Sequence, residues 1–107
     1  MISAASNPIL ARIRHLERVE KRLLNAWIED PRARVSFDFI CRQWLNGENA
    51  LYASVALKRL IIDRLVAQST LYGENPVYYA LDPPGIKTEA ARMDSEKNIR
   101  DIALQSA

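Results

Sequence analysis

The stretch ALKRLIIDRLVAQSTLYGENPVYYAL, Ala56–Leu81, begins with the pattern of a helix and ends with the pattern of a β-hairpin. Its first part lacks glycine and proline, and its leucines and isoleucines recur at helical spacing along one face. Its second part has two runs of β-favouring residues, 70–72 and 77–79, around a Gly-Glu-Asn-Pro turn signal. We therefore predict a helix over 50–68 that leads directly into a two-stranded hairpin.

The sequence before this helix predicts a second helix and a tight turn. Ser36 is a good N-cap for a helix over 37–46, whose apolar residues are spaced three and four apart. NGEN, 46–49, is a turn signal in which Gly47 is free to take positive φ. A short extended piece is expected just upstream, over 32–35.

Helices are also expected at both ends of the chain. Asn7 is a good N-cap and proline suits the first helical position, so the first helix should span 8–29 and end before Pro31. The last helix is expected from a cap at Thr88 to about Leu104. Its apolar stripe is weak and its sequence is polar, which is typical of a frayed or partner-dependent helix.

The order of these elements resembles the winged helix-turn-helix superfamily of bacterial and phage DNA-binding domains. The residues that carry the resemblance are VSFDFICRQWL for the first helix of the motif, NGEN for its turn, ALYASVALKRLIIDRLV for the recognition helix and AQSTLYGENPVYYAL for the wing. The resemblance implies a mainly α fold with a small β-hairpin. It places a winged-helix domain with a long N-terminal helix at 1–85 and a C-terminal helical extension at 86–107.

The resemblance also implies a function and a set of contact residues. In the superfamily, the recognition helix lies in the major groove and the wing lies near the backbone or minor groove. The matching positions in this sequence are Tyr52, Ser54, Lys58, Arg59 and, at the wing tip, Asn75. We therefore expect double-stranded DNA as the partner of a small transcriptional regulator, or of an accessory factor of a phage or mobile element. A homodimer is expected, because two recognition helices reading adjacent half-sites multiply affinity.

The outward face of the predicted recognition helix favours an alternative. A helical wheel places the core face along one side, and that face comprises Ala53, Leu57, Leu60 and Ile61. On the opposite side, Ile62 and Val66 are expected to lie under the wing, whereas Leu51 and Val55 have no cover within the motif. An exposed apolar pair suggests a protein contact or cover from a terminal helix. The alternative function is therefore a winged-helix module that grips a protein partner through Leu51 and Val55 and does not read DNA.

Two residues depart from the superfamily pattern. The recognition helix usually ends in a Gly-Leu step, but Arg64 precedes Leu65 here, and a left-handed arginine costs about 1 kcal/mol or more. The helix should therefore run on to about Gln68 or end in a different shape. At the wing tip, Glu74 stands where DNA-binding wings more often carry a basic residue, which counts against DNA binding.

The composition is that of a soluble globular protein of one domain. The net charge is +2, and the first 34 residues hold seven basic and four acidic residues, a net of +3. This balance permits a nucleic-acid partner without requiring one. The lone Cys41 rules out an intrachain disulfide and suits a buried thiol in a reducing compartment. With no secretory signal and no apolar run of roughly 20 residues, we expect a cytoplasmic protein without a membrane partner.

The chemistry of an enzyme finds no support in the sequence. There is no glycine-rich phosphate loop, and the sole histidine, His15, has no cysteine or histidine partner at ligand spacing. Cys41 lies on the apolar face of a predicted helix, which disfavours a Cys–His nucleophile. We expect neither catalysis nor a metal or other cofactor.

Overall fold

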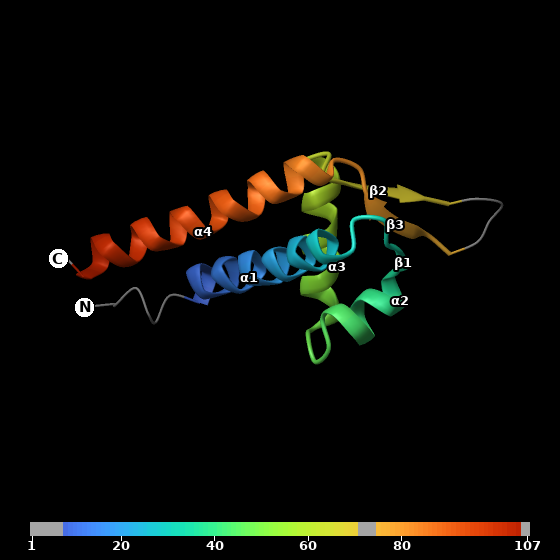
Figure 1. Cartoon of the computed structure of the whole chain (residues 1–107). Helices are drawn as coiled ribbons and strands as arrows, with labels where there is room; N and C mark the ends of the chain where they lie inside the picture. Colours follow the sequence, from blue (N-terminus) through green and yellow to red (C-terminus); the bar gives the residue numbers. More distant parts are fainter. Residues whose placement is uncertain (1–7, 71–74, 106–107) are drawn as a thin grey trace.

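The computed structural model describes residues 8–70 and 75–105, with side chains up to Glu96 (Figure 1). The elements are α1 (Pro8–Glu29), β1 (Arg34–Ser36), α2 (Phe37–Phe39), the π-helical turn η2 (Ile40–Trp44), α3 (Ala50–Ile62), β2 (Val66–Ser69), β3 (Val77–Ala80) and α4 (Pro83–Gln105). The chain is therefore mainly helical with a small antiparallel sheet, and this part of the predicted fold is confirmed.

Helices α1 and α4 lie side by side and run in opposite directions, so the start of α1 and the end of α4 lie at the same end of the described structure (Figure 1). Helix α1 has the predicted bounds. Its C-terminal half is buried in the core, whereas Ile9 and Ile13 near its start are exposed. Lys21 ties the two helices together, because it pairs with Asp94 and its Nζ donates to the carbonyl oxygen of Ala90 at 3.3 Å.

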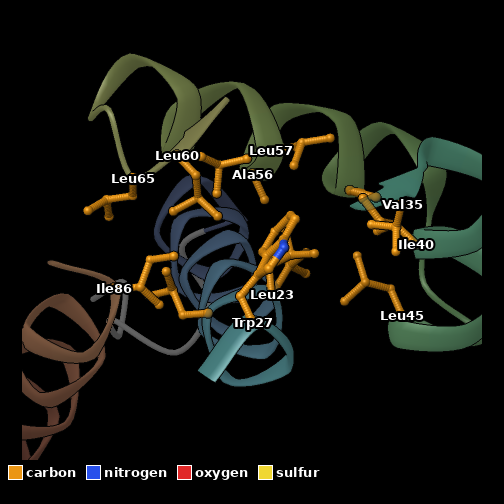
Figure 2. Packing of buried hydrophobic residues seen from close by; sticks show 14 of the residues in the cluster. Leu23, Trp27, Val35, Ile40, Leu45, Ala56, Leu57, Leu60, Leu65 and Ile86 are labelled. Carbon is orange, nitrogen blue, oxygen red and sulfur yellow. The ribbon is translucent and has the colours of Figure 1, made fainter. Parts of the chain in front are cut away.

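The core lies where α3 crosses α1 (Figure 2). Trp27 occupies its centre, is 1% exposed, and meets Trp44 edge-on with ring centroids 4.8 Å apart. The fully buried residues around it come from almost every element: Val19, Leu23 and Leu24 of α1, Ile40 and Leu45 around η2, Ala53, Ala56 and Leu60 of α3, and Ile86 of α4. This cluster fixes the position of α3, whose far side faces solvent.

The sheet has three strands in the order β1-β3-β2, all antiparallel. The sequence predicted a two-stranded hairpin, and the extended piece before α2 adds the third strand, with Val35 opposite Tyr78. The predicted strand over 77–79 is confirmed. The predicted strand over 70–72 is wrong at its start, because β2 ends at Ser69. Leu71 and Tyr72 lie outside the described residues.

The predicted third helix was too long, because α3 ends at Ile62 and not near Gln68. Arg64 takes the left-handed conformation with φ 61°. The Leu65 N–H donates to the Leu60 carbonyl at 3.0 Å and the Arg64 N–H to the Ile61 carbonyl at 3.0 Å, which is the Schellman pattern of helix termination. Because the chain turns sharply here, Leu65 and Val66 enter the core, at 9% and 1% exposure.

Replacing Arg64 with glycine should stabilise the protein by about 1 kcal/mol, because glycine takes positive φ without the steric cost of a Cβ. Arg64 is exposed, so the substitution removes no buried contact. Chemical denaturation of both proteins measures the difference. Arg64→Ala is the control, since it removes the guanidinium but keeps the Cβ, and it should give no such gain. An equal gain from alanine would contradict backbone strain as the cause.

The predicted helix over 37–46 begins as expected but changes its winding. The Phe39 N–H donates to Ser36 Oγ at 3.1 Å, which confirms the cap. From Ile40 to Trp44 the helix is π-helical, and the Leu45 N–H donates to the carbonyl of Ile40, five residues earlier, at 2.8 Å. A π-turn brings residues five apart to nearly the same side, so Ile40 and Leu45 are both fully buried. The following turn is confirmed, with φ 86° at Gly47.

Helix α4 begins earlier than predicted, at Pro83, and Thr88 is not its cap. Asp82 caps the helix, because its Oδ1 accepts the Gly85 N–H at 3.1 Å. The Thr88 hydroxyl instead donates to the carbonyl of Pro84, one turn back, at 3.0 Å. The two prolines stand in the first turn, where the missing N–H groups cost no intrahelical hydrogen bond.

Gly85 lies so close to the cap that a Cβ there would meet Asp82 Oδ2 at 2.3 Å. We expect Gly85→Ala to lower stability by about 1 kcal/mol through loss of the cap, although alanine is the better helix former. Thermal or urea denaturation measures the loss. In an Asp82→Ala background the same substitution should cost far less. An equal loss in both backgrounds would assign the effect to another contact.

Candidate nucleic-acid interface

The exposed side of α3 is the candidate interface, and the N-terminus of the helix is firmly fixed. Asn49 Oδ1 accepts the Leu51 N–H at 2.7 Å and caps the helix. The predicted core face is confirmed for Ala53, Leu57 and Leu60, which are at most 2% exposed, and Ile61 is half-buried. Leu51, Val55 and Ile62, by contrast, face away from this core and are exposed.

Three apolar residues form a stripe along this opposite side, which we call the α3 stripe: Leu51, Val55 and Ile62. Their exposed fractions are 68%, 38% and 76%. Leu51 and Val55 are thus uncovered, as expected. The predicted cover of Ile62 by the wing is wrong, because the helix ends at Ile62 and this residue stays 76% exposed, whereas Val66, the first residue of β2, is buried in the core.

A hollow of about 200 Å³ lies between α3 and the sheet. The residues that line it are Phe37, Ser54, Leu57, Lys58, Ile61, Gln68 and Tyr78. Two predicted contact residues, Ser54 and Lys58, therefore meet here. Sequence reasoning did not assign Gln68 and Tyr78 to the site. Their pairing across β2 and β3 puts both side chains on the face of the sheet that looks toward α3.

Arg59, another predicted contact residue, points back toward α1. Its Nε lies 2.9 Å from Oε1 of Glu20. This ion pair lacks the alignment of a hydrogen bond, since the buried oxygen has no hydrogen-bond partner in the described part of the chain. Burial raises the pKa of Glu20 to about 7. The positive charge of Arg59 opposes this rise, and the acidic groups of Asp63, Glu17 and Glu89 add to it. Glu20 is a functional candidate that sequence reasoning missed.

Tyr52 is half-buried and acts as an anchor for the turn before α3. Its ring meets His15 edge-on, with centroids 4.8 Å apart, and His15 Nε2 lies 2.6 Å from Glu48 Oε1. Burial alone would raise the pKa of Glu48. Hydrogen bonds from His15 and from the Asn49 N–H outweigh burial, so the pKa of Glu48 lies below its usual value. Tyr52, His15 and Glu48 together hold the turn before α3 against α1.

The last predicted contact residue, Asn75, is exposed just before β3, and Glu74 lies outside the described residues. On the outer face of the sheet, the Arg34 guanidinium lies 4.9 Å from the centre of the Tyr79 ring. Arg34 and Tyr79 lie opposite each other in the pairing of β1 with β3, which explains this contact. Arg34 adds a basic group beside the hairpin that sequence reasoning did not single out.

Within the described part of the chain, no group of three or more His, Cys, Asp or Glu residues is arranged to hold a metal ion. None of the described helices is both long and apolar enough to cross a membrane. Cys41 is half-buried, and burial, aided by the charge of Asp38, raises the pKa of its thiol. The chain matches no protein-family model, and no curated protein or solved structure is significantly similar to it.

Proposed function

We propose that this chain is a winged-helix protein that binds double-stranded DNA, with α3 as the recognition helix and the β2–β3 hairpin as the wing. The observation that carries the proposal is the hollow between α3 and the sheet, whose lining includes the polar side chains of Ser54, Lys58, Gln68 and Tyr78. Further support comes from the element order, α1-β1-α2-α3-β2-β3, and from the placement of β1 beside β3.

The hollow suits a phosphate of the DNA backbone. Lys58 supplies a positive charge, and the side chains of Ser54, Gln68 and Tyr78 supply hydrogen-bond donors of the kinds that bind phosphate oxygens. With the backbone anchored here, the first half of α3 would face the bases. Leu51 and Val55 suit apolar contact with thymine methyl groups, which are read in the major groove.

The biological role that fits this site is a small transcriptional regulator or an accessory DNA-binding factor of a phage or mobile element. We further propose that the protein acts as a homodimer, because one short recognition helix offers few base contacts and two half-sites multiply affinity. Sedimentation with and without a duplex tests the dimer. A single monomer on every duplex would contradict it.

The function is tested by fluorescence anisotropy with a random-sequence duplex at about 50 and 200 mM salt, since binding through phosphates weakens steeply as salt rises. We expect Lys58→Ala to lower affinity about tenfold, the loss of one charged hydrogen bond, and to flatten the salt dependence. Lys87→Ala, at an exposed site on α4, is the matched control and should bind like the parent. Absence of binding at low salt would overturn the proposed function.

A second candidate function is a winged-helix module that binds a protein and not DNA. The α3 stripe favours it, because Leu51 and Ile62 expose more than two thirds of their surface, at 68% and 76%. Such apolar contacts respond weakly to salt. If Val55→Glu abolished a salt-insensitive partner interaction and the protein ignored duplex DNA, this second function would replace the first.

A further inference from the structure

Glu20 and Arg59 form a link between α1 and the candidate interface. The Glu20 residue is 7% exposed where α1 and α3 cross, and its Oε1 has no hydrogen-bond partner among the residues that the structure describes. The Arg59 side chain is 46% exposed, and its guanidinium reaches back to this carboxylate at 2.9 Å. The arginine therefore has one buried partner on the α1 side and open solvent on the other.

The charged groups around Glu20 come from all three long helices. Arg59 and Asp63 face it from α3, Glu89 from α4, and Glu17 from one turn earlier on α1. Glu89 is itself bound by Arg92, and Lys21 is held by Asp94 on α4. Among the charged groups of the described residues that act on Glu20, Arg59 is therefore the one cation, so a neutral Glu20 leaves the guanidinium without its buried partner.

We propose that Glu20 is a positioning residue that controls whether Arg59 is available to DNA. Ionised Glu20 holds the guanidinium against α1, and protonation of Glu20 releases it to the exposed side of α3, where it binds a phosphate. The inference rests on the proposed function, and it makes DNA binding an event that takes up one proton.

The direction of the effect follows from charge. An ionised Glu20 competes with phosphate for Arg59, and it adds a negative charge near the DNA. A neutral Glu20 does neither. After release, the nearest acidic group on the same helix is Asp63, which is exposed and four residues away. Exposed pairs of this kind contribute little, so Asp63 does not hold Arg59 away from a phosphate.

The test is duplex affinity between pH 6 and pH 8 at constant salt. If the neutral form alone binds with full strength, the competent fraction falls about tenfold across this range for a group that titrates near pH 7, and affinity falls with it. Glu20→Gln should bind at pH 8 as strongly as the parent binds at pH 6, with a flat profile. Arg59→Gln should bind weakly at both pH values.

His15 needs its own control, because histidine side chains gain a proton in the same range. His15→Gln should keep the pH dependence that Glu20→Gln removes. NMR of the free protein gives a second measurement: the Arg59 Nε resonance should shift with the same midpoint as the Glu20 carboxyl carbon.

The outcomes separate the two proposals. Binding with no pH dependence, or with a dependence that survives in Glu20→Gln, would overturn the control of Arg59 and leave DNA binding intact. An Arg59 resonance that does not follow Glu20 would overturn it as well. Absence of duplex binding at every pH would overturn the proposed function and, with it, the role of Glu20 in DNA binding.

Discussion

At pH 8, Glu20→Gln is expected to raise the free energy of unfolding by about 2–3 kcal/mol, whereas at pH 4 it should leave this free energy almost unchanged. The cause is burial of a carboxyl group, which raises the pKa of Glu20 from 4.5 to about 7 in the folded protein. The folded state therefore binds this proton more tightly than the unfolded state. The stability gained by binding this proton to Glu20 is complete below pH 4.5 and is lost as pH rises through 7. Glutamine keeps the shape without the charge.

Urea denaturation of both proteins at pH 4, 6, 7 and 8 measures the effect, and the difference between the proteins is the relevant quantity. Other groups titrate in this range: the pKa of Glu48 is lowered, so its contribution is lost at acid pH. Contributions of this kind are the same in both proteins, so they cancel in the difference between the two free energies of unfolding. Glu29→Gln, at an exposed site on the same helix, is the control and should show no rise with pH. A difference that is constant from pH 4 to pH 8 would exclude titration of Glu20 as its cause.

The sequence predicted well the bounds of those elements that begin and end at signals in the neighbouring residues. Helix α1 has the expected bounds because proline suits its start and Pro31 follows its end, signals that need no knowledge of the rest of the chain. The Ser36 cap and the positive φ of Gly47 are local in the same sense. Such features depend on neighbouring residues, so a sequence contains all the information needed.

The end of α3 could not be predicted from neighbouring residues alone, because the cost of a left-handed Arg64 had to be compared with the gain from burying Leu65 and Val66. A left-handed Arg64 costs about 1 kcal/mol or more. Ending the helix there places Leu65 and Val66 in the core, and full burial of a leucine or valine contributes about 1.5–3 kcal/mol. The burial term is larger, but it is visible only once β2 is paired with β3. The extended piece over 32–35 was predicted, but its pairing with β3 was not, for the same reason: Val35 and Tyr78 are far apart in the sequence.

The residues of the candidate site likewise fall into two groups: those predicted from local sequence, and those that depend on the pairing of distant segments. Ser54 and Lys58 were predicted from the helix alone, whereas their neighbours Gln68 and Tyr78 depend on the strand register. Glu20 was missed although a signal was present. Its position continues the apolar stripe of α1 formed by Leu16, Leu23 and Trp27 at helical spacing. An acidic residue on such a stripe predicts a buried carboxylate.

Trp27→Ala should lower the free energy of unfolding by about 3–5 kcal/mol, the largest effect expected for a single substitution in this chain. Trp27 is 1% exposed, its ring meets Trp44 edge-on, and its Nε1 donates to the Ala33 carbonyl at 3.3 Å. The substitution therefore leaves a cavity and removes a tie between α1 and the segment that leads into β1.

Trp44→Ala is the comparison that isolates burial from ring size. Trp44 is half-buried at the outer side of the same aromatic pair, where Phe39 also meets it at 6.0 Å between centroids. Both substitutions abolish the edge-on contact, so the difference between them reports mainly the cavity and the lost Ala33 hydrogen bond at Trp27. We expect Trp44→Ala to cost clearly less in urea denaturation at a single pH. Equal losses would mean that the aromatic pair, and not the packing of α1 against α3, holds this end of the core together.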